Sequence, residues 1–334
     1  MLSDLALSEE NRSLQTILWR SQPSDKLKEY CLNTITYGTT PASYLATACL
    51  EKLAQECEEK TSLASRAIKS DFYMDDLLTG ANTIADAVNL REEVINTMNS
   101  AGFVLRKWIF NEHALLTNIS NNNDDPMFIL NIDGTAVKTL GLYWDPRTDA
   151  YQYKISNRNY TNDLAMSKRK VLSTIATIYD PLGLIGPVIV TAKILMQKLW
   201  QHKLEWDAVL PAQLKEEWGN YLEELTDIEN IKIPRRIIGV ENNNEIEMHG
   251  FADASICAYG ACIYLKATDE YGNCTARLVA AKSRVAPLKV VSLARLELCA
   301  AVLLIQLVEK VIPILNIKIK NKYYWTDSAI VNPG

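Results

Sequence analysis

The last third of the chain alternates strand-like and helical segments in an order that few folds share. Three strands are predicted over 248–255, 259–265 and 277–284, where the sequence pattern changes to an alternating one. Short turns separate these segments, so we expect an antiparallel meander. A long apolar helix is predicted over 292–310, with Ser at its N-cap position. A final strand over 322–328 completes the series.

Three acidic residues mark these elements. Asp253 and Asp327 stand near the ends of the first and last strands, and Glu297 lies in the first turns of the apolar helix. An unpaired carboxylate on so apolar a helix is costly to bury. A divalent metal shared by three carboxylates would offset that cost, and hard oxygen ligands favour Mg²⁺ or Mn²⁺. The pattern predicts a metal site, with a purely structural role for the acids as the alternative.

A second acidic pair, Asp75 and Asp76, interrupts the apolar run 71–78. Neighbouring side chains on an extended chain point to opposite faces, so only a turn brings both carboxylates to one site. We expect a tight hairpin with both aspartates at its tip. Two close carboxylates repel unless a cation lies between them, which again indicates Mg²⁺ or Mn²⁺. For the bare dipeptide, a solvated turn is the commoner interpretation.

The residues around this pair carry a family resemblance. Tyr73-Met74-Asp75-Asp76 between apolar neighbours resembles the palm motif of reverse transcriptases. The wider strings resemble the polymerase of BEL/Pao-type retrotransposons, the Pao retrotransposon family, and the likeness covers nearly the whole chain. These strings are 72–83, 102–108, 179–183 and 203–206.

The pattern of the last third resembles ribonuclease H. The segments 251–255, 295–300 and 325–328 are similar to its first three catalytic elements, which contain Asp253, Glu297 and Asp327. This resemblance implies two-metal hydrolysis of the RNA strand of an RNA–DNA hybrid. For the earlier pair of aspartates it implies RNA-directed synthesis of DNA from deoxynucleotides, on an RNA template with a DNA primer.

The resemblance also implies roles in binding. The floor beneath the nucleotide would contain Gly38, Pro41 and Tyr44, and Lys107 would lie near the nucleotide phosphates. Leu140 and Gly141 would belong to the primer grip. Each of these positions also suits an ordinary turn, strand or solvated side chain.

Basic residues are concentrated late in the chain. Residues 246–334 carry ten Lys and Arg against seven Asp and Glu, although the whole chain has a net charge of −5. A track along a nucleic-acid backbone and a solvated basic face are both compatible with Lys282, Arg284, Lys289 and Arg295. Lys168, Arg169 and Lys170 could likewise face phosphates or belong to an amphipathic packing region.

The fold class expected is α+β, in four parts. Residues 1–110 would form a partial polymerase palm, with an antiparallel sheet and helices. Residues 111–160 would form primer-grip-like strands, and residues 161–240 a helical thumb and connection. A polar linker at 241–245 would precede residues 246–334, a ribonuclease H-like α/β domain truncated at its C-terminus.

The remaining elements follow from periodicity, turn residues and caps. Helices are expected over 42–59, 84–100, 167–179, 187–202 and 211–225, and strands over 13–20, 30–37, 103–108, 137–145 and 151–154.

Composition excludes several classes of function. Seven cysteines without C-x-x-C indicate reduced thiols, and the N-terminus lacks a signal peptide, so we expect an intracellular setting in the cytoplasm or a virus-like particle. The apolar run 182–199 is a poor membrane span, and no membrane partner is expected. Three scattered histidines suit neither zinc nor a hydrolase triad. The string 133–135 has the wrong order for an aspartic protease.

Two departures from the family pattern bear on activity. The nearest candidate for a further palm aspartate, Asp4, is out of register, and the chain stops soon after Asp327. We therefore expect an internal slice of a polyprotein, with the remaining polyprotein segments as partners and impaired catalysis. The alternative is a non-catalytic, host-retained scaffold that binds nucleic acid or protein.

Overall fold

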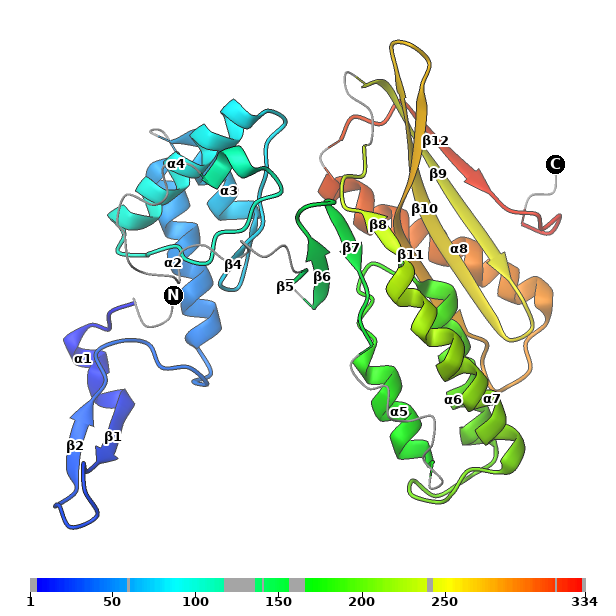
Figure 1. The fold of residues 1–334 in the computed structure, drawn as a ribbon, viewed down its shortest axis with the longest axis horizontal. Helices are drawn as coiled ribbons and strands as arrows, with labels where there is room; N and C mark the ends of the chain where they lie inside the picture. Colours follow the sequence, from blue (N-terminus) through cyan, green and yellow to red (C-terminus); the bar gives the residue numbers. More distant parts are fainter. Residues whose placement is uncertain are drawn as a thin grey trace. The chain divides into compact units, whose positions relative to one another are not determined.

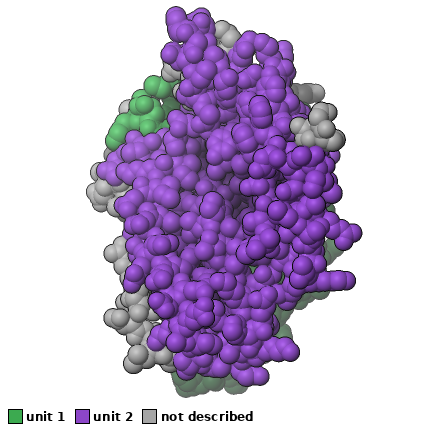
Figure 2. Space-filling view, turned by 90° about the vertical axis from the view of Figure 1, so that its right-hand side faces the viewer, with its two compact units in different colours: residues 1–133 green, residues 134–334 purple. Residues whose placement is uncertain are grey.

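The chain divides into two compact units, residues 1–133 and 134–334 (Figure 2). Both contain helices and strands, which confirms the α+β class (Figure 1). The computed structural model describes residues 5–58, 61–116, 136–139, 141–155, 166–238, 243–315 and 317–331.

Three helices form the core of the first unit: α2 (Ala42–Cys57), α3 (Ser62–Ser70) and α4 (Ile84–Ser100). The start of α4 is fixed by Thr83, whose hydroxyl accepts a hydrogen bond from the Asp86 N–H at 3.1 Å. The predictions for α2 and α4 are confirmed, and α3 was not predicted. The buried side chains between the helices are Leu50, Leu53, Ala54, Ala64, Ala67, Ile68, Leu90, Val94, Met98 and Phe103.

The strands of this unit form two hairpins. One pairs β1 (Thr16–Trp19) with β2 (Lys28–Cys31), and the other pairs β3 (Phe72–Tyr73) with β4 (Asp76–Leu77). The strand predicted over 30–37 is wrong beyond Cys31, where β2 ends, although Thr34 forms an isolated bridge with Ala6. Short helical segments flank the pairs: α1 (Glu9–Arg12), η2 (Ser13–Gln15) and η3 (His113–Leu116).

The strand predicted over 103–108 is wrong. Phe103 is buried in the helical core, with its N–H donating to the Met98 carbonyl at 3.0 Å. Lys107 has a left-handed backbone, with φ of 59°, which an extended strand does not accommodate. The rings of Trp108 and Phe110 stack with centroids 5.6 Å apart. An irregular backbone therefore replaces the predicted strand, with a β-bridge residue at Trp108.

A small antiparallel sheet opens the second unit, in the order β5-β6-β7-β8. The strand predicted over 137–145 with an interruption at Gly141 forms two paired strands, and Gly141 lies in the turn between them. Gly141 has φ of 85°, and a Cβ there would overlap the Tyr179 ring. The strands are β5 (Val137–Thr139), β6 (Leu142–Asp145), β7 (Ala150–Gln152) and β8 (Lys232–Pro234).

Three helices pack on one face of this sheet, as predicted: α5 (Lys168–Thr177), α6 (Gly186–Gln201) and α7 (Ala212–Leu225), which continues into η5 (Thr226–Asn230). Their shared core includes Val171, Ala192, Leu199, Trp218 and Leu222.

The larger sheet has the order β11-β10-β9-β12. β12 pairs parallel to β9, whereas the other neighbours are antiparallel, which confirms the predicted meander, helix and returning strand. α8 lies across one face of this sheet (Figure 1). The elements are β9 (Asn243–Ala254), β10 (Ala258–Asp269), β11 (Cys274–Val285), α8 (Leu293–Val311), η6 (Ile312–Leu315) and β12 (Asn321–Trp325).

The segment Leu293–Leu315 is long and apolar enough to cross a membrane by composition alone. On the side of α8 that faces the sheet, packing explains the apolar residues, because Leu296, Ala300 and Leu304 are buried there. The core also explains Gly250, since a Cβ there would lie 2.8 Å from Leu304 Cδ1. The apolar character of α8 is therefore partly that of a helix covering a sheet.

Candidate active site

Two adjacent parallel strands carry Asp253 and Asp327 to the same end of the larger sheet. The register pairs Phe251 on β9 with Trp325 on β12, and each aspartate lies two residues further along its own segment. Both carboxylate side chains belong to exposed residues. β9 and β12 run side by side in Figure 1. The carboxyl ends of parallel strands thus bring together two of the three predicted acids.

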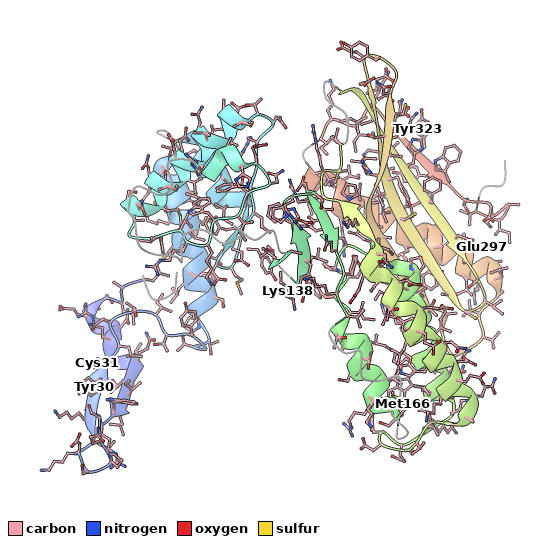
Figure 3. All side chains as sticks on the ribbon, in the orientation of Figure 1. Tyr30, Cys31, Lys138, Met166, Glu297 and Tyr323 are labelled. Atoms are coloured by element: carbon pink, nitrogen blue, oxygen red, sulfur yellow. The ribbon has the colours of Figure 1, made fainter. Side chains whose placement is uncertain are left out.

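Glu297 reaches the same region from α8. Its carboxylate accepts a hydrogen bond from the Ser328 hydroxyl, and Ser328 directly follows Asp327. Ser328 is only 6% exposed, whereas Glu297 is half-buried (Figure 3). Sequence reasoning missed Ser328 as a partner, although its place beside a strand-end acid was a usable signal.

The chemistry of this donor set fits Mg²⁺, because all three groups are carboxylates. Among the described residues, however, no three His, Cys, Asp or Glu side chains lie close enough together to bind one metal ion. Asp253 Oδ1 accepts the N–H of the following Ala254 at 2.7 Å, and Glu297 is engaged by Ser328. The acids share one end of the sheet without forming a metal centre.

Aromatic rings join β9 to β12 just before the two aspartates. Trp325 Nε1 donates a hydrogen bond to His249 Nδ1 at 3.2 Å. The His249 and Tyr323 rings stack at 5.1 Å, and the Phe251 and Trp325 rings at 6.3 Å. Met248 is buried in the core between the sheet and α8. Because side chains alternate along a strand, the next residue, His249, and the rings stacked on it lie on the opposite face of the sheet. The stack fixes the register on which the positions of the acids depend.

The hairpin predicted around Asp75 and Asp76 is present. Tyr73 pairs with Asp76, so the turn residues are Met74, with φ of 57°, and Asp75. Only Asp75 therefore lies at the tip, and the prediction that both do is wrong, because the two-residue turn begins one position earlier. Both aspartates are exposed.

Asp71, which sequence reasoning did not single out, closes the base of this hairpin. Its carboxylate accepts hydrogen bonds from Thr79 Oγ1 at 2.6 Å and from Ser70 Oγ at 2.7 Å.

The proposed nucleotide and primer residues occupy separate turns. Gly38 has φ of 83°, Pro41 precedes α2, and Tyr44 is 75% exposed in the first turn of that helix. Lys107 is exposed, and Gly141 lies against Tyr179. Leu140 lies outside the described residues.

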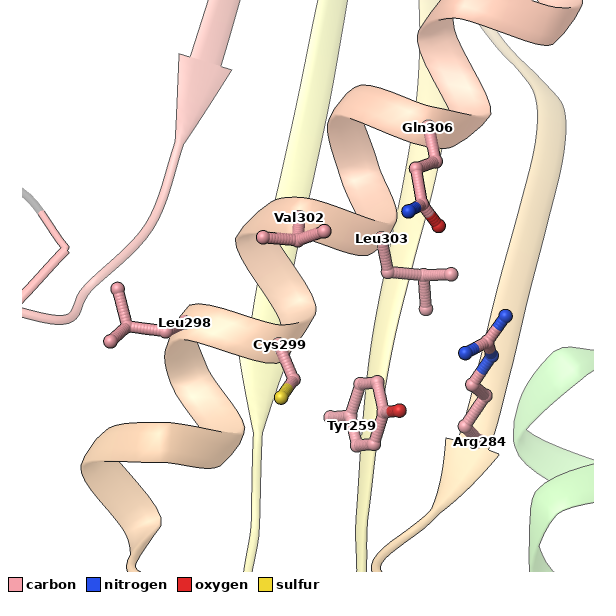
Figure 4. Close-up of a pocket in the computed structure, with 7 residues that line it drawn as sticks. All are labelled: Tyr259, Arg284, Leu298, Cys299, Val302, Leu303 and Gln306. Carbon is pink, nitrogen blue, oxygen red and sulfur yellow. The ribbon is translucent and has the colours of Figure 1, made fainter.

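Lys282, Arg284, Lys289 and Arg295 are all exposed. Arg284 lines a cavity of about 230 Å³ between the sheet and α8, where it and Tyr259 face side chains of the helix (Figure 4). The helix contributes Leu298, Cys299, Val302, Leu303 and Gln306.

The suggestion that α5 directs its first basic residues to phosphates is wrong for Lys168. That side chain is buried, donates to the Leu204 carbonyl at 2.7 Å and lies 4.0 Å from the centroid of the Trp200 ring. Arg169 pairs with Asp207 through two hydrogen bonds of 2.7 and 3.0 Å. Both side chains, Lys168 and Arg169, are therefore engaged by partners within the protein.

Comparison with known families identifies much of the second unit. Residues 167–328 match the model of the Pao retrotransposon-like RNaseH-like domain. This region is similar to that Pao retrotransposon-like family. The match includes α5, α6 and α7 as well as the larger sheet, and it contains Asp253, Glu297 and Asp327. The linker proposed at 241–245 falls inside it and inside the second compact unit.

No curated protein matches the chain. Solved structures that it resembles include a foamy viral protease-reverse transcriptase, termed dRH, in complex with double-stranded DNA, at 14% identity and a TM-score of 0.48. A foamy viral protease-reverse transcriptase with double-stranded DNA matches at 13% identity and a TM-score of 0.27. The matches cover 98% and 96% of this chain but only 49% and 56% of those chains. The chain thus spans about half the length of these structures.

Proposed function

We propose that the Pao retrotransposon-like region cleaves the RNA strand of an RNA–DNA hybrid, as part of a reverse-transcribing polyprotein. The observation that carries this proposal is the placement of Asp253 and Asp327 at the ends of two adjacent parallel strands. The contact between Ser328 and Glu297 adds the third acid to that end of the sheet.

Asp253, Glu297 and Asp327 would hold Mg²⁺ or Mn²⁺, and the bound metal would supply an activated water and stabilise the leaving oxygen. Asp253 and Asp327 are exposed, so their side chains can rotate towards Glu297 at little steric cost. Ser328 holds the half-buried Glu297 carboxylate beside the segment that carries Asp327. The 2′-hydroxyls and shape of the hybrid would select the RNA strand.

The test compares hybrid cleavage by the whole chain with cleavage by Asp253→Asn, in Mg²⁺ and in a chelator. Glu309→Gln, which changes an exposed acid elsewhere on α8, is the matched control. We expect cleavage only in Mg²⁺, abolished by Asp253→Asn and retained by the control. Calorimetric titration with Mg²⁺ gives a second readout, in which Asp253→Asn should weaken binding. Equal cleavage by all three proteins, or none by the unmodified chain, contradicts the proposal.

A second proposal concerns the first unit, where the β3–β4 turn exposes Asp75. Asp75 and Asp76 would hold the metal for DNA synthesis from deoxynucleotides, on an RNA template with a DNA primer. Primer extension by the whole chain should be lost in Asp75→Asn and retained in Asp25→Asn, which alters an exposed acid in the turn between β1 and β2. Extension by both variants, or by neither variant nor the parent chain, rejects a polymerase role.

A non-catalytic scaffold that binds nucleic acid or protein is the alternative. A scaffold would bind an RNA–DNA hybrid with the same affinity before and after Asp253→Asn, and it would not cleave. Measuring binding and cleavage on the same samples separates these two functions.

A further inference from the structure

The small sheet β5-β6-β7-β8 carries a row of lysines on the face turned away from its core. The register places Lys138 opposite Tyr143, Tyr143 opposite Gln152, and Gln152 opposite Lys232. Directly opposed residues of an antiparallel sheet project from the same face. Lys154, two positions after Gln152, belongs to that face as well. Lys138, Lys154 and Lys232 are all exposed (Lys138 is labelled in Figure 3).

The other face of the same sheet is apolar. Leu142 and Tyr153 are buried in the helical core, and Tyr151 and Ile233 pack against it. The sheet therefore has one apolar face, which packs on the helical core, and one face that carries exposed lysines. The lysines are therefore held on a rigid support.

Tyr143 positions two of the three ammonium groups. Lys154 Nζ lies 4.9 Å and Lys138 Nζ 5.9 Å from the centroid of its ring, within the range of cation–π attraction. A ring attracts a cation without neutralising it, unlike a carboxylate. Within the described part of the chain, Lys138, Lys154 and Lys232 form no ion pair. Their positive charge is thus available to a ligand.

Within strands β5 to β8, one carboxylate lies on the same face as the lysines, that of Asp145, and it is already hydrogen-bonded within the protein. Asp145 is 3% exposed and accepts hydrogen bonds from the Arg147 N–H at 3.0 Å and from Gln152 Nε2 at 3.3 Å. Arg147 also donates from Nε at 3.4 Å, while most of its side chain remains in solvent. The exposed charge contributed by these side chains is accordingly positive.

A small cavity adjoins one end of the row. It measures about 50 Å³, and its lining includes Lys138, Tyr143, Gln152 and Lys154. The turn at Gly141 and the apolar or weakly polar residues Leu142, Tyr153, Ile155, Thr177, Ile178, Tyr179 and Ile228 complete it. A cavity of this size has room for a small polar group such as an anionic oxygen. Lys138 and Lys154 would face such a group from two strands.

We propose that Lys138, Lys154 and Lys232 bind phosphates of a nucleic-acid strand, whose backbone crosses the sheet from β5 to β8. Three interstrand steps of about 4.8 Å span about 14 Å, which is four nucleotides at about 3.4 Å each. Lysine acts as a point charge and suits phosphates of any sequence. The choice of nucleic acid over an acidic peptide rests on the proposed function, whereas the anion site rests on the sheet alone.

The test measures binding of a fluorescent single-stranded oligonucleotide to the whole chain between 50 and 200 mM salt by anisotropy. The variant is Lys138→Gln, Lys154→Gln and Lys232→Gln together. The control removes the same charge from exposed lysines elsewhere in the unit, through Lys193→Gln, Lys310→Gln and Lys318→Gln. Single-strand binding changes by about 0.7 in logarithmic salt slope per phosphate contact, so the variant should lose about 2 in slope. The control should lose much less.

Equal slopes for the variant and the control overturn the inference, as does failure of the unmodified chain to bind the oligonucleotide. If polyglutamate competes as well as the oligonucleotide, and the variant loses affinity for both alike, the ligand assignment is wrong. Hybrid cleavage is scored separately with Asp253→Asn. If the salt slope of binding depends on the three lysines but no hybrid is cleaved, the phosphate track is supported and the nuclease is rejected. If hybrid is cleaved but the slope does not depend on the lysines, the nuclease is supported and the phosphate track is rejected.

Discussion

The Ser328 hydroxyl donates a hydrogen bond to the Glu297 carboxylate, although 31 residues separate the two in sequence. Ser328 is buried, and its neighbour Asp327 is exposed. The bond ties the first turns of α8 to the segment after β12. It therefore couples the helix and strand that contribute two of the three acids.

Replacing Ser328 with Ala should lower the free energy of unfolding by about 2 kcal/mol, since hydrogen bonds to charged groups contribute about 1.5–3 kcal/mol. Urea denaturation measures the change. The control is Ser292→Ala at the N-cap of α8, where the side chain makes no capping bond. That change should cost less than about 0.5 kcal/mol. Equal decreases in the free energy of unfolding for the two variants would show that the Ser328 hydrogen bond does not contribute measurably to stability.

Gly183→Ala should destabilise the second unit by more than about 2 kcal/mol, as substitutions forced into overpacked positions do. Gly183 has φ of 74°, and a Cβ would overlap the backbone carbonyl of Ala281 on β11. The same contact includes a hydrogen bond of 2.8 Å from the Ala281 N–H to the Leu182 carbonyl. Gly186→Ala is the control, because no atom lies within 4 Å of the added Cβ. Thermal unfolding of both variants decides the comparison.

Lys168→Met should lower the free energy of unfolding by about 2 kcal/mol, because it leaves the Leu204 carbonyl without its donor and removes a cation from between two rings. Lys168 Nζ lies 4.0 Å from the Trp200 ring centroid and 4.8 Å from that of Trp206. Urea titration followed by tryptophan fluorescence is the measurement. The exposed residue Lys193 provides the control, and an equal effect of Lys193→Met would contradict the assigned role.

Asp145 should make folding sensitive to acid. Burial acts to raise the pKa of its carboxyl, but hydrogen bonds from the Arg147 backbone and from the Thr148 and Arg147 side chains outweigh it, so the pKa lies below the usual 3.8. A lowered pKa in the folded state contributes stability above pH 3.8, which is lost as pH falls through the folded value. Asp145→Asn should flatten the decline in the free energy of unfolding between pH 5 and pH 3. Parallel curves for the two proteins would refute this.

Local signals predicted most helices because their ends are set by nearby residues. Thr83 caps α4, and Gly102, with φ of 79°, ends it. The order of the larger sheet followed from strand and helix periodicity together. The acids Asp253 and Asp327 were placed at strand ends by the same reasoning, and the register confirms that they reach one end of the sheet.

The failures arose where distant residues decide the outcome. A lysine in a basic run, such as Lys168, is expected to be solvent-exposed. Its burial depends on Trp200 and Trp206, which are distant in sequence and which the fold places around it. Glycine is the usual sequence signal for a left-handed backbone, and Lys107 adopts that conformation without being glycine, so the sequence did not reveal it. The lysine row depends on the pairing of β8 with β7, two strands that lie far apart in the chain.

The parallel pairing of β9 with β12 has a consequence for folding kinetics. His249 and Trp325 are 76 residues apart in sequence, and β10, β11 and α8 lie between them. Contacts of such long range close slowly, whereas hairpins joined by short turns form within microseconds. The meander should therefore assemble early and β12 dock last. Tryptophan emission from Trp325 would then report the rate-limiting step, and the polypeptide would acquire its complete acidic end only in that final phase.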